Sequence, residues 1–322
     1  MSNSKLRHVK KGREAEKVGG IRGRLRILLL ACGLVLLIVL LLFLLPKPSS
    51  MEKHKATWLW DTSMIEDNTN SILSFCEEQG VDVIFLQVQK KVTLDHYRSF
   101  ITAATTKGIS VHALDGTPDW AYKKKRSEGN DLLKWVIDYN NGSVDGARFT
   151  GIQFDVEPYQ LQRWKRDQNE VVREWSDNMD SWIAEGSSHG LYMSAAVPFW
   201  LDETRAADGS ESLSRWMIRK FDAVAVMSYR DSGQGMYDLA RNELKQADKL
   251  GKSVWIGLEL ARSKEGAHVS FFRKDVPIME EEMKTANRLG EEHPSFAGIA
   301  VHHYEEWQSK VASTESQKQD RK

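Results

Sequence analysis

Eight short apolar runs rich in Val and Ile recur between residues 57 and 301, and no other feature of this sequence constrains its fold as strongly. Near-continuous apolar runs are typical of parallel strands that are covered on both faces. The runs occupy 57–60, 81–88, 109–114, 151–156, 191–197, 221–227, 254–258 and 298–301. We therefore expect eight strands, each buried on both sides.

Helix-like stretches lie between most of these runs, at 66–79, 95–106, 131–139, 161–185, 234–250 and 276–289. Gly80 and Gly251 follow two of them, and a glycine in this place is a common signal for the end of a helix. Strand–helix alternation repeated around eight strands predicts an α/β fold of the (β/α)8 TIM-barrel type. An open doubly wound sheet is the competing fold, but Trp60-Asp61-Thr62-Ser63 stands where its Gly-rich phosphate loop would be.

The segment 27–45 contains no charged residue and is followed by Pro46-Lys47-Pro48. A helix of this length spans close to the ~30 Å hydrocarbon core of a bilayer, whereas the apolar core of a cleaved signal peptide is ~7–15 residues long. We predict an uncleaved, single-pass signal anchor in the cell membrane; a cleaved secretory signal is the alternative. Residues 1–26 are strongly basic, so the positive-inside rule predicts a cytoplasmic N-terminus and an extracytoplasmic barrel.

The predicted domains follow from these segments. They are a basic cytoplasmic segment at 1–26, a transmembrane signal anchor at 27–45, a linker at 46–55, a barrel catalytic domain at 56–307 and a polar disordered tail at 308–322. Acidic side chains outnumber basic ones beyond residue 26, which argues against nucleic-acid binding by the folded part. The two cysteines, Cys32 and Cys76, give no disulfide framework.

Polar and aromatic side chains gather where the predicted strands end. In a TIM barrel the active site lies at the carboxyl ends of the strands. The candidate site residues at these ends are Trp60, Asp61, Gln87, Asp115, Asp155, Glu157, Trp200, Tyr229, Arg230, Asp231, Glu259, His302, His303 and Tyr304.

The segment Gly151-Ile152-Gln153-Phe154-Asp155-Val156-Glu157-Pro158 carries the strongest local signal. Side chains two apart on a strand point the same way, so Gln153, Asp155 and Glu157 should line up while the residues between them pack on the other side. Two neighbouring carboxylates repel when both are ionised, which raises one pKa toward the value that a general acid needs near neutral pH. The alternative is that these two acids at the strand end have a structural role and form ion pairs with Arg or Lys.

This segment resembles the glycoside hydrolase family 18 signature, Asp-Gly-x-Asp-x-Asp-x-Glu. In the run 150–157, Asp155 and Glu157 match the final Asp and Glu, while Thr150 and Gln153 stand at the first two Asp positions. Three later strands are similar to further family motifs in the correct order. They are Met227-Ser228-Tyr229-Arg230 for Met-x-Tyr-Asp, Ile256-Gly257-Leu258-Glu259 for Gly-Leu-Pro, and Gly298-Ile299-Ala300-Val301-His302 for Gly-x-Met-x-Trp.

The resemblance implies a divergent, chitinase-like barrel that hydrolyses a 2-acetamido sugar with assistance from the substrate. By position, Glu157 would protonate the leaving oxygen, Asp155 would orient the acetamido group, and Tyr229 would hydrogen-bond its carbonyl. Trp60, Trp200 and His302 would form the walls or floor of the sugar site. The implied substrate is an amino-sugar polymer such as peptidoglycan or a surface polysaccharide, and no cofactor is implied. Gln153 cannot take up the proton that an Asp shares at its position in the family.

Three other interpretations remain open. Glu157, followed by Pro158, and Glu259 also occupy the places of an acid/base and a nucleophile in many retaining glycosidases, which need their carboxyls ~5–5.5 Å apart. Gln153 and Arg230 favour a non-catalytic carbohydrate-binding barrel. A metal hydrolase could use Asp155, Glu259 and one of the adjacent His302 and His303, although no His-Glu-x-x-His spacing occurs.

Two predicted loops carry features of their own. The run Lys123-Lys124-Lys125-Arg126 after the third strand is either a solvated loop or a contact for an anionic wall polymer or membrane surface. Residues 202–214 look like a longer loop that would cover the sugar groove.

Overall fold

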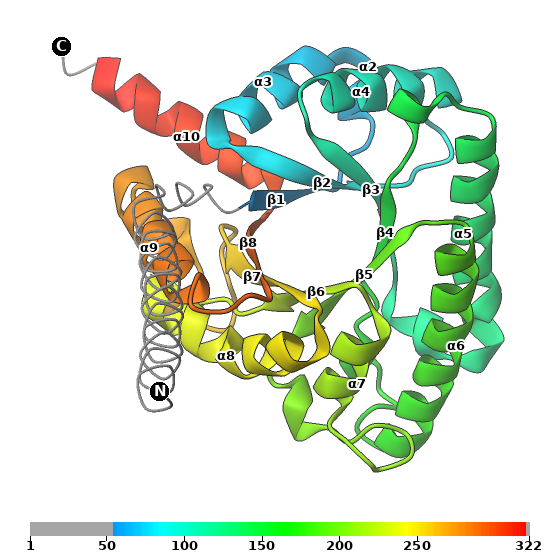
Figure 1. Cartoon of the computed structure of the whole chain (residues 1–322). Helices are drawn as coiled ribbons and strands as arrows, with labels where there is room; N and C mark the ends of the chain where they lie inside the picture. Colours follow the sequence, from blue (N-terminus) through cyan, green and yellow to red (C-terminus); the bar gives the residue numbers. More distant parts are fainter. Residues whose placement is uncertain (1–53, 320–322) are drawn as a thin grey trace, which may run out of the picture. The chain divides into compact units, whose positions relative to one another are not determined.

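The computed structural model describes residues 54–319, which form a closed barrel of eight parallel strands in sequence order (Figure 1). The strands are β1 His54–Leu59, β2 Val81–Gln87, β3 Ser110–Asp115, β4 Gly151–Phe154, β5 Tyr192–Pro198, β6 Ala223–Met227, β7 Ser253–Glu259 and β8 Phe296–His302. The barrel closes where β1 pairs with β8, with Ala56 opposite Ala300. The TIM-barrel prediction is confirmed.

Helices surround the barrel and return the chain from the end of one strand to the start of the next (Figure 1). They are α2 Met64–Asp67, α3 Thr69–Gln79, α4 Leu94–Thr106, α5 Arg126–Asn141, α6 Gln168–Ser188, α7 Leu213–Lys220, α8 Gly233–Leu250, α9 Val276–Gly290 and α10 Tyr304–Gln319. Gly80 and Gly251 end α3 and α8 with φ of +68° and +64°. This left-handed conformation favours glycine, which confirms both sequence signals.

The barrel interior is filled by a few large rings opposite small side chains. Trp58, Phe85 and Trp255 pack there with alanines of β6 and with Ala300. Large residues opposite small ones fill a closed barrel without leaving a pore. The barrel is therefore a solid support for the site at its carboxyl end.

The outer faces of the strands pack against the helices. Ile152, Phe154 and Val156 lie in this outer core, and the ring of Phe154 stacks on Trp182 of α6 at 5.1 Å. Gln153 points into the barrel and is 0% exposed. The predicted alternation of side chains along β4 is therefore confirmed.

Two segments differ from the sequence prediction. The helix expected at 161–185 begins only at Gln168, because Pro158–Gln160 forms a 3-10 turn (η4) and Trp164 is buried from the loop that follows it. The predicted loop 202–214 contains a 3-10 turn (η5, Leu201–Glu203) and an antiparallel bridge between Arg205 and Ser212, and it ends at the start of α7.

The prediction of a disordered tail at 308–322 is wrong for residues 308–319, which belong to α10. Two apolar anchors hold this polar segment, one directly before it and one within it. Trp307 is 1% exposed and packs edge-to-face on Phe75 of α3, and Val311 packs against the same core. Burial of one apolar stripe stabilises a helix whose other faces are polar.

Within residues 54–319 no helix is both long and apolar enough to cross a membrane. The predicted anchor at 27–45 and the basic segment at 1–26 lie outside the described residues, as does residue range 320–322. The last residues of the predicted linker, His54 and Lys55, belong to β1.

Because Trp307 anchors α10 to the barrel, we expect its replacement to lower the stability of the protein. Trp307→Ala should lower the free energy of unfolding by about 3–5 kcal/mol, because it removes a fully buried ring and leaves a cavity. Chemical denaturation of the full chain measures this, with Ser313→Ala on the exposed face of the same helix as the matched control. Equal stability of both variants would contradict the docked helix.

Candidate active site

The candidate site lies at the mouth of the barrel, which we define as the carboxyl ends of the strands and the loops that follow them. Asp155 and Glu157 come directly after β4, where the backbone N–H of Asp155 donates to the carbonyl of Asp115 at 3.1 Å. Gly116 permits this close approach, since a Cβ there would lie 2.3 Å from the carbonyl oxygen of Asp155. Both carboxyls are half-buried, as a site open to a ligand requires.

Burial governs the electrostatics of this pair. Burial, followed by the negative charge of Glu157, raises the pKa of Asp155 to about 7. Burial also raises the pKa of Glu157, against the lowering effect of a hydrogen bond from the Tyr159 hydroxyl. The pair therefore retains a proton near neutral pH, which a general acid needs.

The two carboxyls have different partners. Glu157 accepts hydrogen bonds from Tyr159 and Gln160 of η4, so a local turn orients it. Asp155 Oδ1 is buried and has no hydrogen-bond partner among residues 54–319. Because an unpaired buried acceptor is costly, this oxygen is a place where a bound N–H group would be stabilised.

Gln153 lies one layer below Asp155, inside the barrel. Its Oε1 accepts from Trp58 Nε1 at 2.5 Å, which leaves its Nε2 as a buried donor without a partner in the described part of the chain. Its place in line with Asp155 and Glu157 made Gln153 a candidate substrate-binding residue, but its side chain is fully enclosed and has no surface open to a ligand in this structure.

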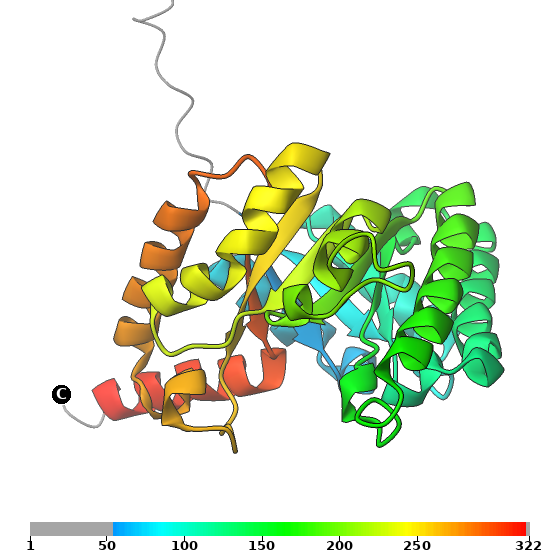
Figure 2. The same cartoon turned by 90° about the horizontal axis from the view of Figure 1, so that it is seen from below.

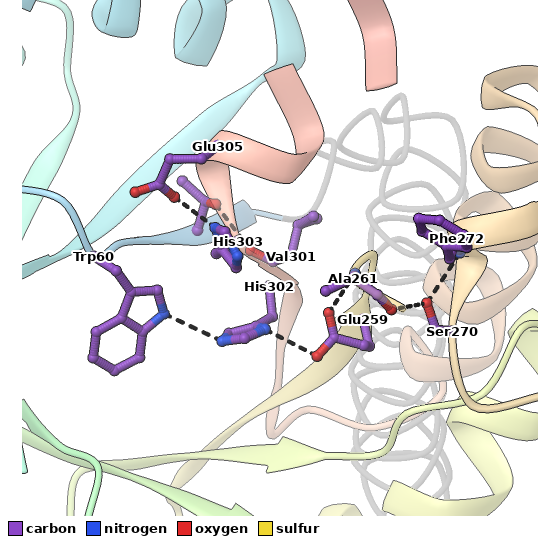
Figure 3. A network of polar contacts seen from close by, with 10 residues as sticks. Trp60, Glu259, Ala261, Ser270, Phe272, Val301, His302, His303 and Glu305 are labelled. Carbon is purple, nitrogen blue, oxygen red and sulfur yellow. Dashed lines mark hydrogen bonds and ion pairs between the residues drawn. The ribbon is translucent and has the colours of Figure 1, made fainter. Parts of the chain in front are cut away.

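A second group of residues links β1, β7 and β8 (Figure 3). Trp60 Nε1 donates to His302 Nε2 at 3.2 Å, and His302 Nδ1 lies 3.0 Å from Glu259 Oε2. Indole N–H can only donate, so Nε2 must accept and Nδ1 carries the proton given to Glu259. The other oxygen of Glu259 accepts from the backbone N–H of Ala261 at 2.7 Å. Glu259 thus links the imidazole of His302 to the backbone of the loop after β7, and through His302 it orients the indole of Trp60.

Tyr229 lies between the two groups. Its ring is 6.0 Å from that of His302. Burial, followed by the charges of Glu259, Asp155 and Glu157, raises the pKa of its phenol well above the usual value. Tyr229 therefore stays protonated and can donate a hydrogen bond to a ligand in the mouth.

The other predicted residues have partners of their own. Trp200 packs edge-to-face on Tyr159 at 5.0 Å, which places it beside Glu157. Gln87 accepts from Gln89, and burial raises the pKa of Asp115. The remaining residues pair at the rim: Asp61 with Ser63, Arg230 over the Phe199 ring, Asp231 with Lys274, and His303 with Glu305.

Tyr304 was predicted as a substrate contact, and the structure contradicts this. Its side chain is 1% exposed and packs on Phe75 in the outer core. The residue is the first of α10, and its ring turns away from the mouth to anchor that helix.

Sequence reasoning missed Tyr159, Gln160, Trp58 and Phe199. Tyr159 and Gln160 follow Glu157-Pro158 directly, so a turn after the acidic pair could have indicated them. Trp58 faces Gln153 across the barrel, a contact that only closure of the sheet creates. Among residues 54–319 no group of three or more His, Cys, Asp or Glu side chains is arranged to hold a metal ion.

These features define a closed (β/α)8 TIM barrel with a cluster of carboxylates and aromatic rings at its mouth. Solved structures with this fold include a glycoside hydrolase family 18 chitinase from Pseudoalteromonas aurantia, with 13% identity over 78% of this chain and 93% of that one and a TM-score of 0.53. The spore cortex-lytic enzyme SleL of Bacillus megaterium QM B1551 is similar at 11% identity over 83% of this chain and 75% of that one, with a TM-score of 0.51.

The PgaB (BpsB) glycoside hydrolase domain of Bordetella bronchiseptica is similar at 11% identity over 82% of this chain and 97% of that one, with a TM-score of 0.50. No protein-family model matches the chain, and no curated protein matches its sequence. At such identities the comparisons establish the fold alone, because one fold can carry many different activities.

The raised pKa of Asp155 predicts a pH-dependent stability. In the folded state this pKa rises from 3.8 to about 7. The unfolded chain therefore releases the proton first as pH rises, and wild-type stability falls between about pH 4 and 7. Asp155→Asn should gain stability relative to wild type across this interval and level off above it.

Urea denaturation at several pH values measures this difference. Asp177→Asn, on the exposed face of α6, is the matched control and should show no such trend. A constant difference between Asp155→Asn and wild type from pH 4 to 8 would show that the carboxyl is not perturbed.

Proposed function

We propose that this protein is a membrane-anchored glycoside hydrolase that cleaves an amino-sugar polysaccharide outside the cytoplasm. The observation that carries the proposal is the unpartnered, buried Oδ1 of Asp155 beside Glu157. In this scheme the oxygen accepts the N–H of a substrate acetamido group, which turns its carbonyl oxygen toward the anomeric carbon. Glu157, held by Tyr159 and Gln160, protonates the departing glycosidic oxygen.

The remaining residues support the same scheme. Tyr229 is a protonated phenol beside both carboxylates and would donate to the acetamido carbonyl. The half-buried rings of Trp60 and Trp200 offer flat surfaces to the apolar faces of sugar rings. The structures with the same fold are named as a chitinase, a spore cortex-lytic enzyme and a glycoside hydrolase domain, and these names favour a polysaccharide as the substrate class.

Loss of the general acid is the first test. Glu157→Gln should lower turnover of soluble chitooligosaccharides or peptidoglycan fragments by about 10²–10⁴-fold while leaving their binding intact. Glu306→Gln, a half-buried glutamate in the first turn of α10, is the matched control and should keep full activity. Binding without turnover in the wild type would instead indicate a non-catalytic carbohydrate-binding barrel.

Glu259 distinguishes the proposed mechanism from a covalent one. Glu259→Gln should reduce activity only moderately, because its carboxylate acts through His302. A loss as large as that of Glu157→Gln, with turnover of sugars that lack an acetamido group, would instead identify Glu259 as a nucleophile.

The membrane anchor is tested separately from catalysis. Full-length protein should sediment with membranes and resist extraction by high salt, whereas a chain lacking residues 1–50 should be released in soluble form. Protease added outside the cell should digest the barrel of the full-length protein. Identical fractionation of both chains would disprove the anchor.

A further inference from the structure

An open groove of about 640 Å³ lies beside the mouth, between the loops that follow β3 and β4. Its lining residues are Tyr122, Lys123, Lys124, Arg163, Glu170 and Glu174. Loops that follow barrel strands lie at the carboxyl end of the barrel. The groove is therefore on the same face as Asp155 and Glu157, and we name it the Tyr122 groove.

The acidic residues of this groove are already neutralised. Glu174 accepts from Arg163 Nη1 at 2.7 Å and from the backbone N–H of Lys123 at 2.6 Å. Glu170 forms an ion pair with Arg173. These acids therefore do not offset the lysine charges.

Two cations of the groove are uncompensated. Lys123 and Lys124 are exposed, and neither forms an ion pair within residues 54–319. Lys125 next to them is different, since it pairs with Glu128 at 3.1 Å and Asp119 at 3.5 Å. The Tyr122 groove thus presents two ammonium groups to an anionic ligand.

An aromatic ring lies between the cations. The half-buried ring of Tyr122 has Lys124 Nζ at 5.6 Å and the Arg163 guanidinium carbon at 5.7 Å from its centroid. A ring of this kind packs against the apolar face of a sugar, and the adjacent cations can hold an acidic substituent of the same sugar.

The groove is also rigidly supported. Asn178 of α6 is fully buried, and its Nδ2 donates to the carbonyls of Trp120 and Tyr122 at 2.9 and 3.0 Å. Its Oδ1 accepts from Arg126 Nε at 2.9 Å. One amide therefore fixes the loop on both sides of the lysines, which lowers the entropy cost of binding.

A second basic region lies across the mouth. A smaller cavity of about 120 Å³ in the loop after β7 is lined by Arg262, Lys264 and Arg273, together with Phe272, which is 49% exposed. This loop leads into α9, which lies on the opposite side of the barrel from α5 and α6 (Figures 1 and 2). Cation-and-ring surfaces thus flank the candidate site on two sides of a domain that is otherwise rich in acids.

We propose that the substrate of the mouth is an acidic polysaccharide, with a carboxylate-bearing sugar packed on Tyr122 and held by Lys123 and Lys124. This inference rests on the proposed function, because it assigns the groove to the same polymer that reaches Glu157. An anionic membrane surface is the competing occupant. The recessed groove and its aromatic ring favour a sugar, since a flat bilayer surface needs neither.

The test compares two probes of equal length on the full-length protein in detergent. Hyaluronan oligosaccharides carry a carboxylate on alternate sugars, and chitooligosaccharides are neutral. Glu157→Gln prevents turnover during titration calorimetry. Hyaluronan should bind about tenfold or more tightly than the neutral probe, and 0.5 M salt should remove this preference.

Substitutions of Lys123 and Lys124 test whether these residues cause the preference for hyaluronan. Lys123→Gln with Lys124→Gln should weaken hyaluronan binding about 2- to 30-fold and leave the neutral probe unchanged. Lys134→Gln with Lys284→Gln makes the same charge change at exposed positions on the outer helices α5 and α9. This control should leave the affinity for both probes unchanged. Equal affinities for both probes, or hyaluronan binding that ignores Lys123 and Lys124, would overturn the proposal.

Two further results separate the possible failures. Trp60→Ala should weaken the binding of both probes. If it does so while the lysine substitutions have no effect, the sugars bind at the mouth, and the proposal that the Tyr122 groove holds a carboxylate is wrong. If the lysine substitutions weaken hyaluronan binding and Trp60→Ala does not, hyaluronan binds in the Tyr122 groove but not at the mouth. That result would contradict the proposed function. In nanodiscs, hyaluronan binding that phosphatidylserine suppresses through Lys123 and Lys124 would assign the groove to the membrane and overturn the proposal.

Discussion

The pairing of β1 with β8 is the constraint on which the rest of this structure depends. It joins residues 54–57 to 298–301, almost the full length of the domain apart in sequence. Closure brings Trp60, at the end of β1, to His302, at the end of β8, and so creates the chain that continues to Glu259. It also lets Trp58 reach across the barrel to Gln153. Without closure, the two halves of the candidate site would not lie together at one end of the barrel.

The interior of the barrel is packed with apolar side chains, whereas the mouth holds two carboxylates close together. Below the mouth, Trp58, Phe85 and Trp255 pack against alanines and exclude water. Directly above this apolar layer, Asp155 and Glu157 are held close together, and burial raises the pKa of both. The apolar support thus produces the electrostatics of the site, because a well-hydrated pair of carboxylates would both ionise.

Charge is distributed unevenly around the mouth, and the loops determine this distribution. The loop after β3 holds Lys123 and Lys124 on a backbone fixed by Asn178, and the loop after β7 carries further cations beside Phe272. A common barrel with divergent loops is how such folds acquire different ligands.

The sequence by itself determined the barrel, the ends of α3 and α8 and the position of the acidic pair, because strand burial, glycine caps and side-chain alternation are local properties that leave a periodic pattern. It also indicated most residues of the mouth. Only the tertiary structure decided that Gln153 is enclosed, that Tyr304 faces the outer core, that 308–319 is helical and that Glu259 is engaged by His302. Each of these depends on contacts between residues distant in the chain, such as Trp58 with Gln153 and Trp307 with Phe75, and no local pattern encodes them.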